Sequence, residues 1–128
     1  KMRAELESQR EALQVRVAGA KWSAVRARQV ADVAEASACG AEREAVEVQR
    51  AYRQGYHSMP VSRRPQALRV AEQVATEAQL ARCEAEGVSL RAATAEEALA
   101  ARRSELEGIC AGISACGQGG EGMGGQGG

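Results

Sequence analysis

Apolar residues recur along the first half of the chain in alternating steps of three and four. The series runs from Leu6 to Tyr52 and has fourteen positions, of which only Arg10 breaks the apolar character. Its members are Leu6, Arg10, Leu13, Val17, Ala20, Ala24, Ala27, Ala31, Ala34, Ala38, Ala41, Ala45, Val48 and Tyr52. This spacing places one apolar stripe along a helix and is typical of a coiled coil. It predicts a first helix over about residues 2–56.

A second series of the same kind runs from Ala67 to Ile113. It also has fourteen positions, and Arg102 is its only polar member. The series consists of Ala67, Ala71, Val74, Ala78, Ala81, Ala85, Val88, Ala92, Ala95, Leu99, Arg102, Leu106, Ile109 and Ile113. It is out of phase with the first series, so the two stripes do not belong to one uninterrupted helix. The pattern predicts a second helix over about residues 63–113.

The segment between the two series contains both prolines of the chain, Pro60 and Pro65. Proline lacks a backbone donor and restricts the residue before it, so a hinge over about residues 57–62 is more probable than a kink. Ser62 is expected to cap the second helix. Pro65 would then lie in the first helical turn, where a missing N–H costs little.

The equal lengths of the two series favour an antiparallel hairpin. If the chain folds back at Pro60, the residue numbers in each facing pair add to 119. Tyr52 then faces Ala67 beside the hinge, and Leu6 faces Ile113 at the open end. All fourteen layers match in this way, which two unrelated segments need not do.

Charged residues beside the stripes support the same register weakly. It brings Glu35 near Arg82 and Arg16 near Glu105, and exposed pairs of this kind contribute only a few tenths of a kcal/mol. The predicted fold is therefore all-α: an antiparallel, Ala-rich two-helix hairpin that can pair into a four-helix bundle. A long parallel dimer is the less favoured alternative, because of the change of phase. A disordered Gly-rich tail is predicted over residues 117–128.

Composition shows why such a hairpin needs a partner. Ala, Glu, Arg, Leu and Lys make up 67 of the 128 residues, and the chain has no Phe and one Trp. Among the 28 stripe positions, 15 are Ala, 11 are larger apolar residues and 2 are Arg. A buried methyl group contributes only about 0.8 kcal/mol. A solitary hairpin is therefore expected to be marginally stable, and another surface is expected to cover it.

Large apolar residues away from the two series indicate where a partner would bind. They form a candidate outer apolar stripe of Val15, Trp22, Val25, Val33, Leu80 and Leu90, with Cys83 nearby. One interpretation is scattered surface residues, which are common. The other is a second interface, at which the hairpin binds another helical protein or a second copy of itself.

The hinge region carries a distinct charge. No acidic residue occurs between Glu47 and Glu72, whereas five arginines do. The candidate binding residues are Arg50, Arg53, Tyr56, His57, Arg63, Arg64 and Arg69. They form either a solvated loop or a site for an acidic protein surface, phosphates or RNA, with tyrosine available for stacking.

No pattern of residues indicates catalysis, and the chain is expected not to be an enzyme. His57 is the only histidine and has no carboxylate nearby in sequence, and no catalytic, cofactor or metal motif occurs. Four separated cysteines without a C-x-x-C pair predict reduced thiols, and hence a cytoplasmic or cytoskeletal protein.

The function predicted from these patterns is that of a structural or scaffolding element. Seventeen basic residues balance seventeen acidic ones, so net charge favours neither nucleic acid nor membrane as a partner. Protein partners are expected instead, and cytoskeletal and ciliary assemblies contain many such helical rods. The alternative is a nucleic-acid-binding helical arm that uses the basic hinge.

Overall fold

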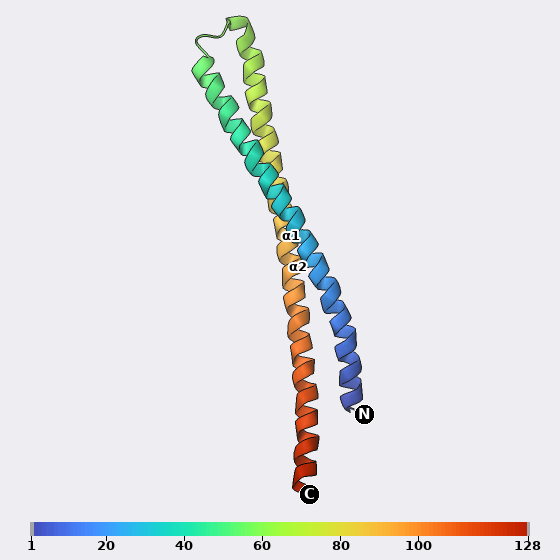
Figure 1. The fold of residues 1–128 in the computed structure, drawn as a ribbon. Helices are drawn as coiled ribbons and strands as arrows, with labels where there is room; N and C mark the ends of the chain where they lie inside the picture. Colours follow the sequence, from blue (N-terminus) through green and yellow to red (C-terminus); the bar gives the residue numbers. More distant parts are fainter. Residues whose placement is uncertain (1, 128) are drawn as a thin grey trace. The chain divides into compact units, whose positions relative to one another are not determined.

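A computed structural model of the chain describes residues 2–127, and the side chains of residues 2–117. It contains α1 (Met2–Gly55), the short 3-10 helix η1 (Val61–Arg63) and α2 (Arg64–Gly127) (Figure 1). The predicted all-α helical hairpin is confirmed, because two long helices are joined by a short turn. The last residue of α1 and the first residue of α2 each lie one position from the predicted boundary.

The far end of α2 differs from the prediction. The apolar series predicted an end near residue 113, whereas the bounds of α2 extend to Gly127. The predicted disorder of residues 117–128 stays a prediction, because the described side chains end at Gly117.

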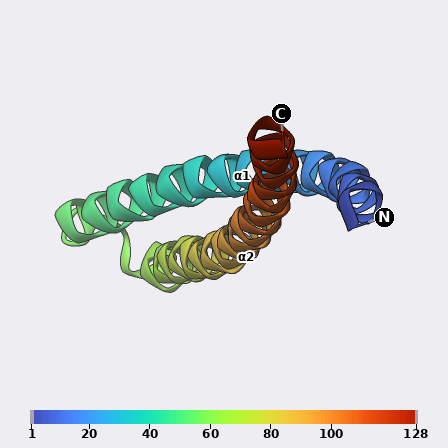
Figure 2. The ribbon, with the colours of Figure 1, turned by 90° about the horizontal axis from the view of Figure 1, so that it is seen from below.

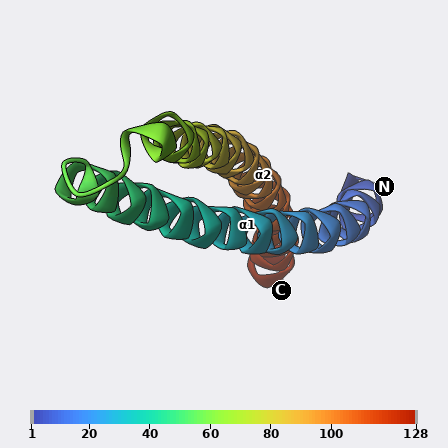
Figure 3. The same ribbon diagram turned by 90° about the horizontal axis from the view of Figure 1, so that it is seen from above.

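The turn between the helices is held by short-range backbone hydrogen bonds. The N–H of Ser58 donates to the carbonyl of Gly55 at 3.2 Å, and the N–H of Met59 donates to the carbonyl of Tyr56 at 3.3 Å. Figures 2 and 3 show this connection, drawn in green, from below and from above. The hinge thus lies where the two prolines predicted it.

The predicted cap of the second helix is wrong. Ser62 lies inside η1, and the residue that precedes this element is Pro60, with φ −55° and ψ 138°. The N–H of Arg63 donates to the carbonyl of Pro60 at 2.9 Å. Because the chain already turns helically directly after Pro60, Ser62 lies two residues beyond the capping position. Pro65 is the second residue of α2, in the first turn as predicted.

The helical stripes predicted from the sequence form the core. The chain divides into two units, which comprise residues 1–26 with 93–128 and residues 27–92. Of the 28 predicted stripe positions, only Arg102 is exposed. The buried apolar residues all belong to the stripes: Leu13, Ala24, Ala31, Ala38, Ala45, Ala71, Ala78, Ala85, Ala92 and Ile113.

Eight of these ten buried residues are alanines that repeat every seven positions. They occupy Ala24, Ala31, Ala38 and Ala45 of α1, and Ala71, Ala78, Ala85 and Ala92 of α2. A strict repeat of seven corresponds to 3.5 residues per turn, the periodicity of a left-handed coiled coil. Alanine permits close approach of the helices but contributes little free energy per side chain.

The unit of residues 1–26 and 93–128 shows the predicted register at the open end. A Cβ atom added to Gly112 would lie 3.7 Å from Cδ1 of Leu6, which places Leu6 beside the neighbour of Ile113. The predicted approach of Arg16 to Glu105 is not observed. Glu105 instead accepts a 3.4 Å hydrogen bond from Nη1 of Arg102 on its own helix, which is the nearer cation.

Candidate interaction surfaces

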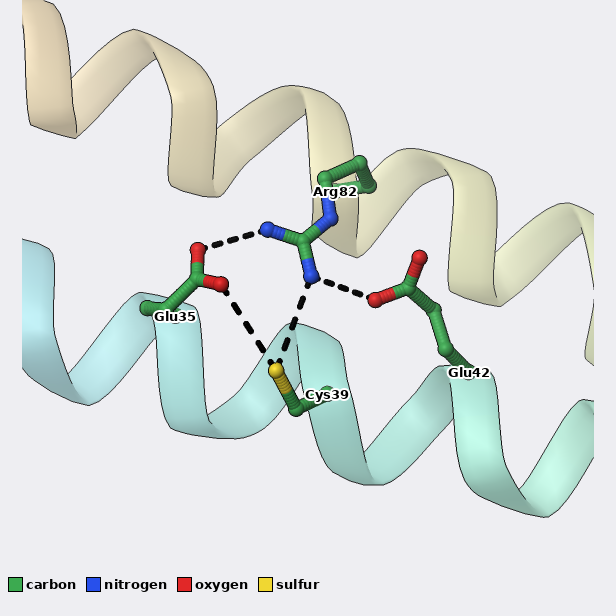
Figure 4. A network of polar contacts seen from close by, with 4 residues as sticks. All are labelled: Glu35, Cys39, Glu42 and Arg82. Carbon is green, nitrogen blue, oxygen red and sulfur yellow. Dashed lines mark hydrogen bonds and ion pairs between the residues drawn. The ribbon is translucent and has the colours of Figure 1, made fainter.

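Residues 27–92 contain a polar cluster that joins α1 to α2, here called the Arg82 clamp (Figure 4). Nη1 of Arg82 donates to Oε2 of Glu35 at 2.6 Å, and Nη2 donates to Oε1 of Glu42. Nη2 also donates to Sγ of Cys39 at 3.6 Å, and this thiol donates to Oε1 of Glu35 at 3.6 Å. The predicted pair of Glu35 and Arg82 is confirmed, whereas the sequence did not indicate Cys39 and Glu42.

The ion pair of Arg82 and Glu42 within the clamp favours the charged forms of both groups. The hydrogen bond from Arg82 lowers the pKa of Glu42 below its ordinary value of 4.5, although desolvation of the carboxylate opposes this shift. Hydrogen bonds to Glu42, Glu35 and Cys39 raise the pKa of Arg82 further above its already high value. The shifts of Glu42 and Arg82 both favour the charged form, which suits a structural tie between helices and not proton transfer.

The hinge brings three of the predicted binding residues together. The guanidinium carbon of Arg64 lies 4.3 Å from the ring centroid of Tyr56, and Nε of Arg64 donates to the carbonyl of Tyr56 at 3.1 Å. Tyr56 also makes edge-to-face contacts with Tyr52 and His57, at centroid distances of 5.7 Å and 5.4 Å. One face of Tyr56 is thus covered by Arg64 and is closed to a stacking base.

The other hinge arginines are oriented differently. Nε of Arg69 donates to the carbonyl of Pro65 at 3.5 Å. Arg50, Arg53 and Arg63 are exposed, and within the described part of the chain none of them forms an ion pair. These three side chains are the members of the predicted basic site that remain available to an anion.

All six residues of the predicted outer apolar stripe are exposed. The exposed fractions are 73% for Val15, 66% for Trp22, 40% for Val25, 71% for Val33, 65% for Leu80 and 70% for Leu90. The first three belong to the unit of residues 1–26 and 93–128, and the last three belong to the unit of residues 27–92. We therefore treat them as separate surfaces. Val33 lines a shallow groove whose other apolar residues are Val30, Ala34 and Ala81.

Four exposed apolar residues of α1 in the unit of residues 1–26 and 93–128 form a regular stripe. Val15, Ala18, Trp22 and Val25 follow the three-four-three spacing of a helix-packing face, and we call them the α1 stripe. All four are exposed. Residues 12–31 contain no acidic residue, while the basic residues in this range are Arg16, Lys21, Arg26 and Arg28. Our sequence interpretation missed this charge bias, although an acid-free run of twenty positions would have shown it.

The second unit carries a stripe of the same spacing on α2. Leu80, Cys83, Gly87 and Leu90 make up this α2 stripe. Gly87 is half-buried and the other three residues are exposed. The residues beside the stripe include three glutamates, Glu77, Glu84 and Glu86. The α2 stripe thus has the same apolar spacing as the α1 stripe and mainly the opposite charge.

The described residues offer no arrangement for metal or membrane chemistry. Among residues 2–117, no three His, Cys, Asp or Glu side chains come together to hold a metal ion. No helix in this part of the chain combines the length and apolar character required to cross a bilayer.

No protein-family model, curated protein sequence or solved structure matches the chain.

Proposed function

We propose that this chain is a non-enzymatic helical interaction element, which acts as a structural or scaffolding part of a larger assembly by binding further helices. One observation carries the proposal: the fully buried apolar residues are mostly small, while many large apolar residues are exposed. Among the residues whose side chains the structure describes, eight of the ten buried apolar residues are alanines, with Leu13 and Ile113 as the only larger ones. Twelve large apolar residues in the same part of the chain are exposed.

The energetic consequence supports a docking role. Burying a side chain such as Trp22, Leu80 or Leu90 contributes roughly 1.5–3 kcal/mol, compared with about 0.8 kcal/mol for an alanine methyl. The free energy available from covering each of these outer residues therefore exceeds the free energy that each buried alanine of the seam supplies. Exposed apolar surface of this kind marks interaction sites in soluble proteins.

The setting that we propose is intracellular. The four cysteines are free thiols, as expected in a reducing compartment. Cytoskeletal and ciliary assemblies use many helical rods, and we propose them as the setting of this chain on that general ground.

Site-specific photo-crosslinking tests the proposal. A photoreactive residue at Val15 or Leu80 is expected to capture a helical partner in cells, whereas the same residue at the exposed positions Arg43 and Arg103 is not. Mass spectrometry of the adducts then maps the partner segment. Equal capture at all four positions would contradict a docking role for the outer residues.

A second candidate function is anion binding at the hinge. It is favoured by Arg50, Arg53 and Arg63, which form no ion pair among the described residues and lie in a segment without acids. RNA binding through this site would weaken steeply with salt. The double change Arg53→Glu and Arg63→Glu is expected to abolish it, and Arg43→Glu is the control. An acidic protein surface is the other ligand to test at this site.

A further inference from the structure

We infer that the α1 stripe binds the α2 stripe of a second copy of this chain. This inference rests on the proposed function, because it names the helix that covers the outer apolar residues. Three observations carry it: the charges beside the two stripes, the sizes of the facing side chains, and the agreement of both in one register.

The α1 stripe presents basic charge that its own chain leaves uncompensated. In the described part of the molecule, Arg16, Lys21 and Arg26 form no ion pair. The acid-free run of residues 12–31 means that no carboxylate on the same helix segment lies beside them. The segment that binds here is therefore expected to carry acidic residues next to its apolar face.

The α2 stripe meets that requirement. Glu84 and Glu86 form no ion pair among the described residues. The nearest cation in the sequence, Arg82, is held by Glu35 and Glu42 of α1. The α2 stripe thus presents the acidic charge of Glu84 and Glu86 to a partner.

The apolar residues of the two stripes fit one another in an antiparallel register. The facing pairs are Val15 with Leu90, Ala18 with Gly87, Trp22 with Cys83, and Val25 with Leu80. The pair of Ala18 and Gly87 permits close approach of the two helices, since a Cβ added at Gly87 meets nothing within 4 Å. The large ring of Trp22 is placed against the small side chain of Cys83, so no two bulky groups meet.

The flanking charges select the same register. In an antiparallel pair, like-lettered flanking positions face each other. Lys21 then faces Glu86, while Arg26 lies between Glu77 and Glu84, so all of these approaches are attractive. A parallel pairing of the same stripes would bring Lys21 beside Arg91. Charge therefore favours the antiparallel arrangement, in which the side-chain sizes also fit.

Self-association follows because one chain carries both complementary surfaces. The contact is heterologous, since a different patch is used on each partner. When two copies are joined by one such contact, the α2 stripe of one copy and the α1 stripe of the other copy remain unbound. Association beyond the dimer is therefore expected unless the second pair of stripes also closes.

Charge reversal with mixing tests this inference on the full chain, by sedimentation velocity and Trp22 fluorescence. The wild type is expected to self-associate with rising concentration and to show a blue shift of its single tryptophan. The variants Lys21→Glu with Arg26→Glu, and Glu84→Lys with Glu86→Lys, should each associate at least about tenfold more weakly. An equimolar mixture of these two variants should associate again, because one retains an intact α2 stripe and the other an intact α1 stripe.

The control is a pair of charge reversals away from both stripes. The variant Arg43→Glu with Arg103→Glu has the same change in net charge as the first variant and should associate like the wild type. A monomeric wild type, or a mixture that does not associate, overturns the inference. The proposed function would survive this result if the outer residues crosslink to a different protein. A blue shift of Trp22 with anionic phospholipid vesicles but not with rising protein concentration would also overturn it, in favour of a lipid surface.

Discussion

Arg82 of α2 donates a 2.6 Å hydrogen bond to Glu35 of α1, which lies 47 positions earlier in the chain. The side chains that pack the two helices around this contact are mostly alanines, whose methyl groups distinguish poorly between one layer and the next. The contact therefore contributes alignment as well as stability. Arg82 also donates to Glu42, and the contribution of this second carboxylate to stability can be measured through its pH dependence.

Acid should remove the contribution of Glu42 to stability. Its folded pKa lies below the ordinary value of 4.5, so the contribution is complete above that value and is lost as the pH falls through the folded pKa. We expect Glu42→Gln to lower the melting temperature at neutral pH, with a smaller difference from wild type at a pH below 4.5. Thermal unfolding followed by circular dichroism measures both. Glu44→Gln is the matched control, and an equal deficit at both pH values would contradict the prediction.

Replacement of Arg10 by leucine should stabilise the hairpin. The Nε atom of Arg10 is shielded from solvent and has no hydrogen-bond partner among the described residues. Such a group typically costs about 1–3 kcal/mol, and Arg10→Leu should recover part of that in urea unfolding. The control is Arg102→Leu, because Arg102 is exposed and already pairs with Glu105. A loss of stability in Arg10→Leu would show that the arginine fixes the register of its layer.

Alanine at position 40 should also raise stability. A Cβ at Gly40 meets nothing within 4 Å, and no described glycine has a positive φ. Glycine inside a helix costs about 1 kcal/mol relative to alanine, so Gly40→Ala should increase the free energy of unfolding by roughly 0.5–1 kcal/mol. A decrease, measured at a protein concentration where the chain is associated, would instead place Gly40 in an interface.

Removal of the Arg64 side chain should loosen the hinge. Arg64→Ala removes both the contact with the ring of Tyr56 and the hydrogen bond to its carbonyl, for an expected loss of about 1–2 kcal/mol. Arg64→Lys should restore little of this, because an ammonium group cannot stack and donate from Nε in the same way. Arg63→Ala is the control at an exposed neighbour. Equal effects of the changes at positions 63 and 64 would contradict a special role for Arg64.

The repeat of apolar residues predicted the seam well, because burial in a coiled coil follows from local spacing that every turn of helix repeats. Arg102 alone among the 28 predicted positions is exposed, because its long side chain carries the guanidinium out to Glu105 of its own helix. The cap at Ser62 was predicted wrongly since the conformation of Pro60 starts the helical turn earlier. That conformation depends on how the turn closes, which spacing alone does not determine.

The surfaces were predicted less completely than the seam. Cys39 and Glu42 join Arg82 through particular orientations of long side chains, which no sequence pattern specifies. The basic surroundings of Trp22, by contrast, are visible in the sequence, because residues 12–31 contain no Asp or Glu. An absence of acids along one face of a helix is easily overlooked when the net charge of the whole chain is zero.

The seven-residue repeat of buried alanines has a mechanical consequence. Sliding one helix of residues 27–92 by seven positions again places small apolar residues opposite one another, and Glu35 and Glu42 are themselves seven positions apart. A displaced Arg82 would therefore still reach one carboxylate. Under a pull along the helix axis, this part of the protein should yield in steps of one repeat, about 10 Å each, and should re-form contacts after every step instead of rupturing at once.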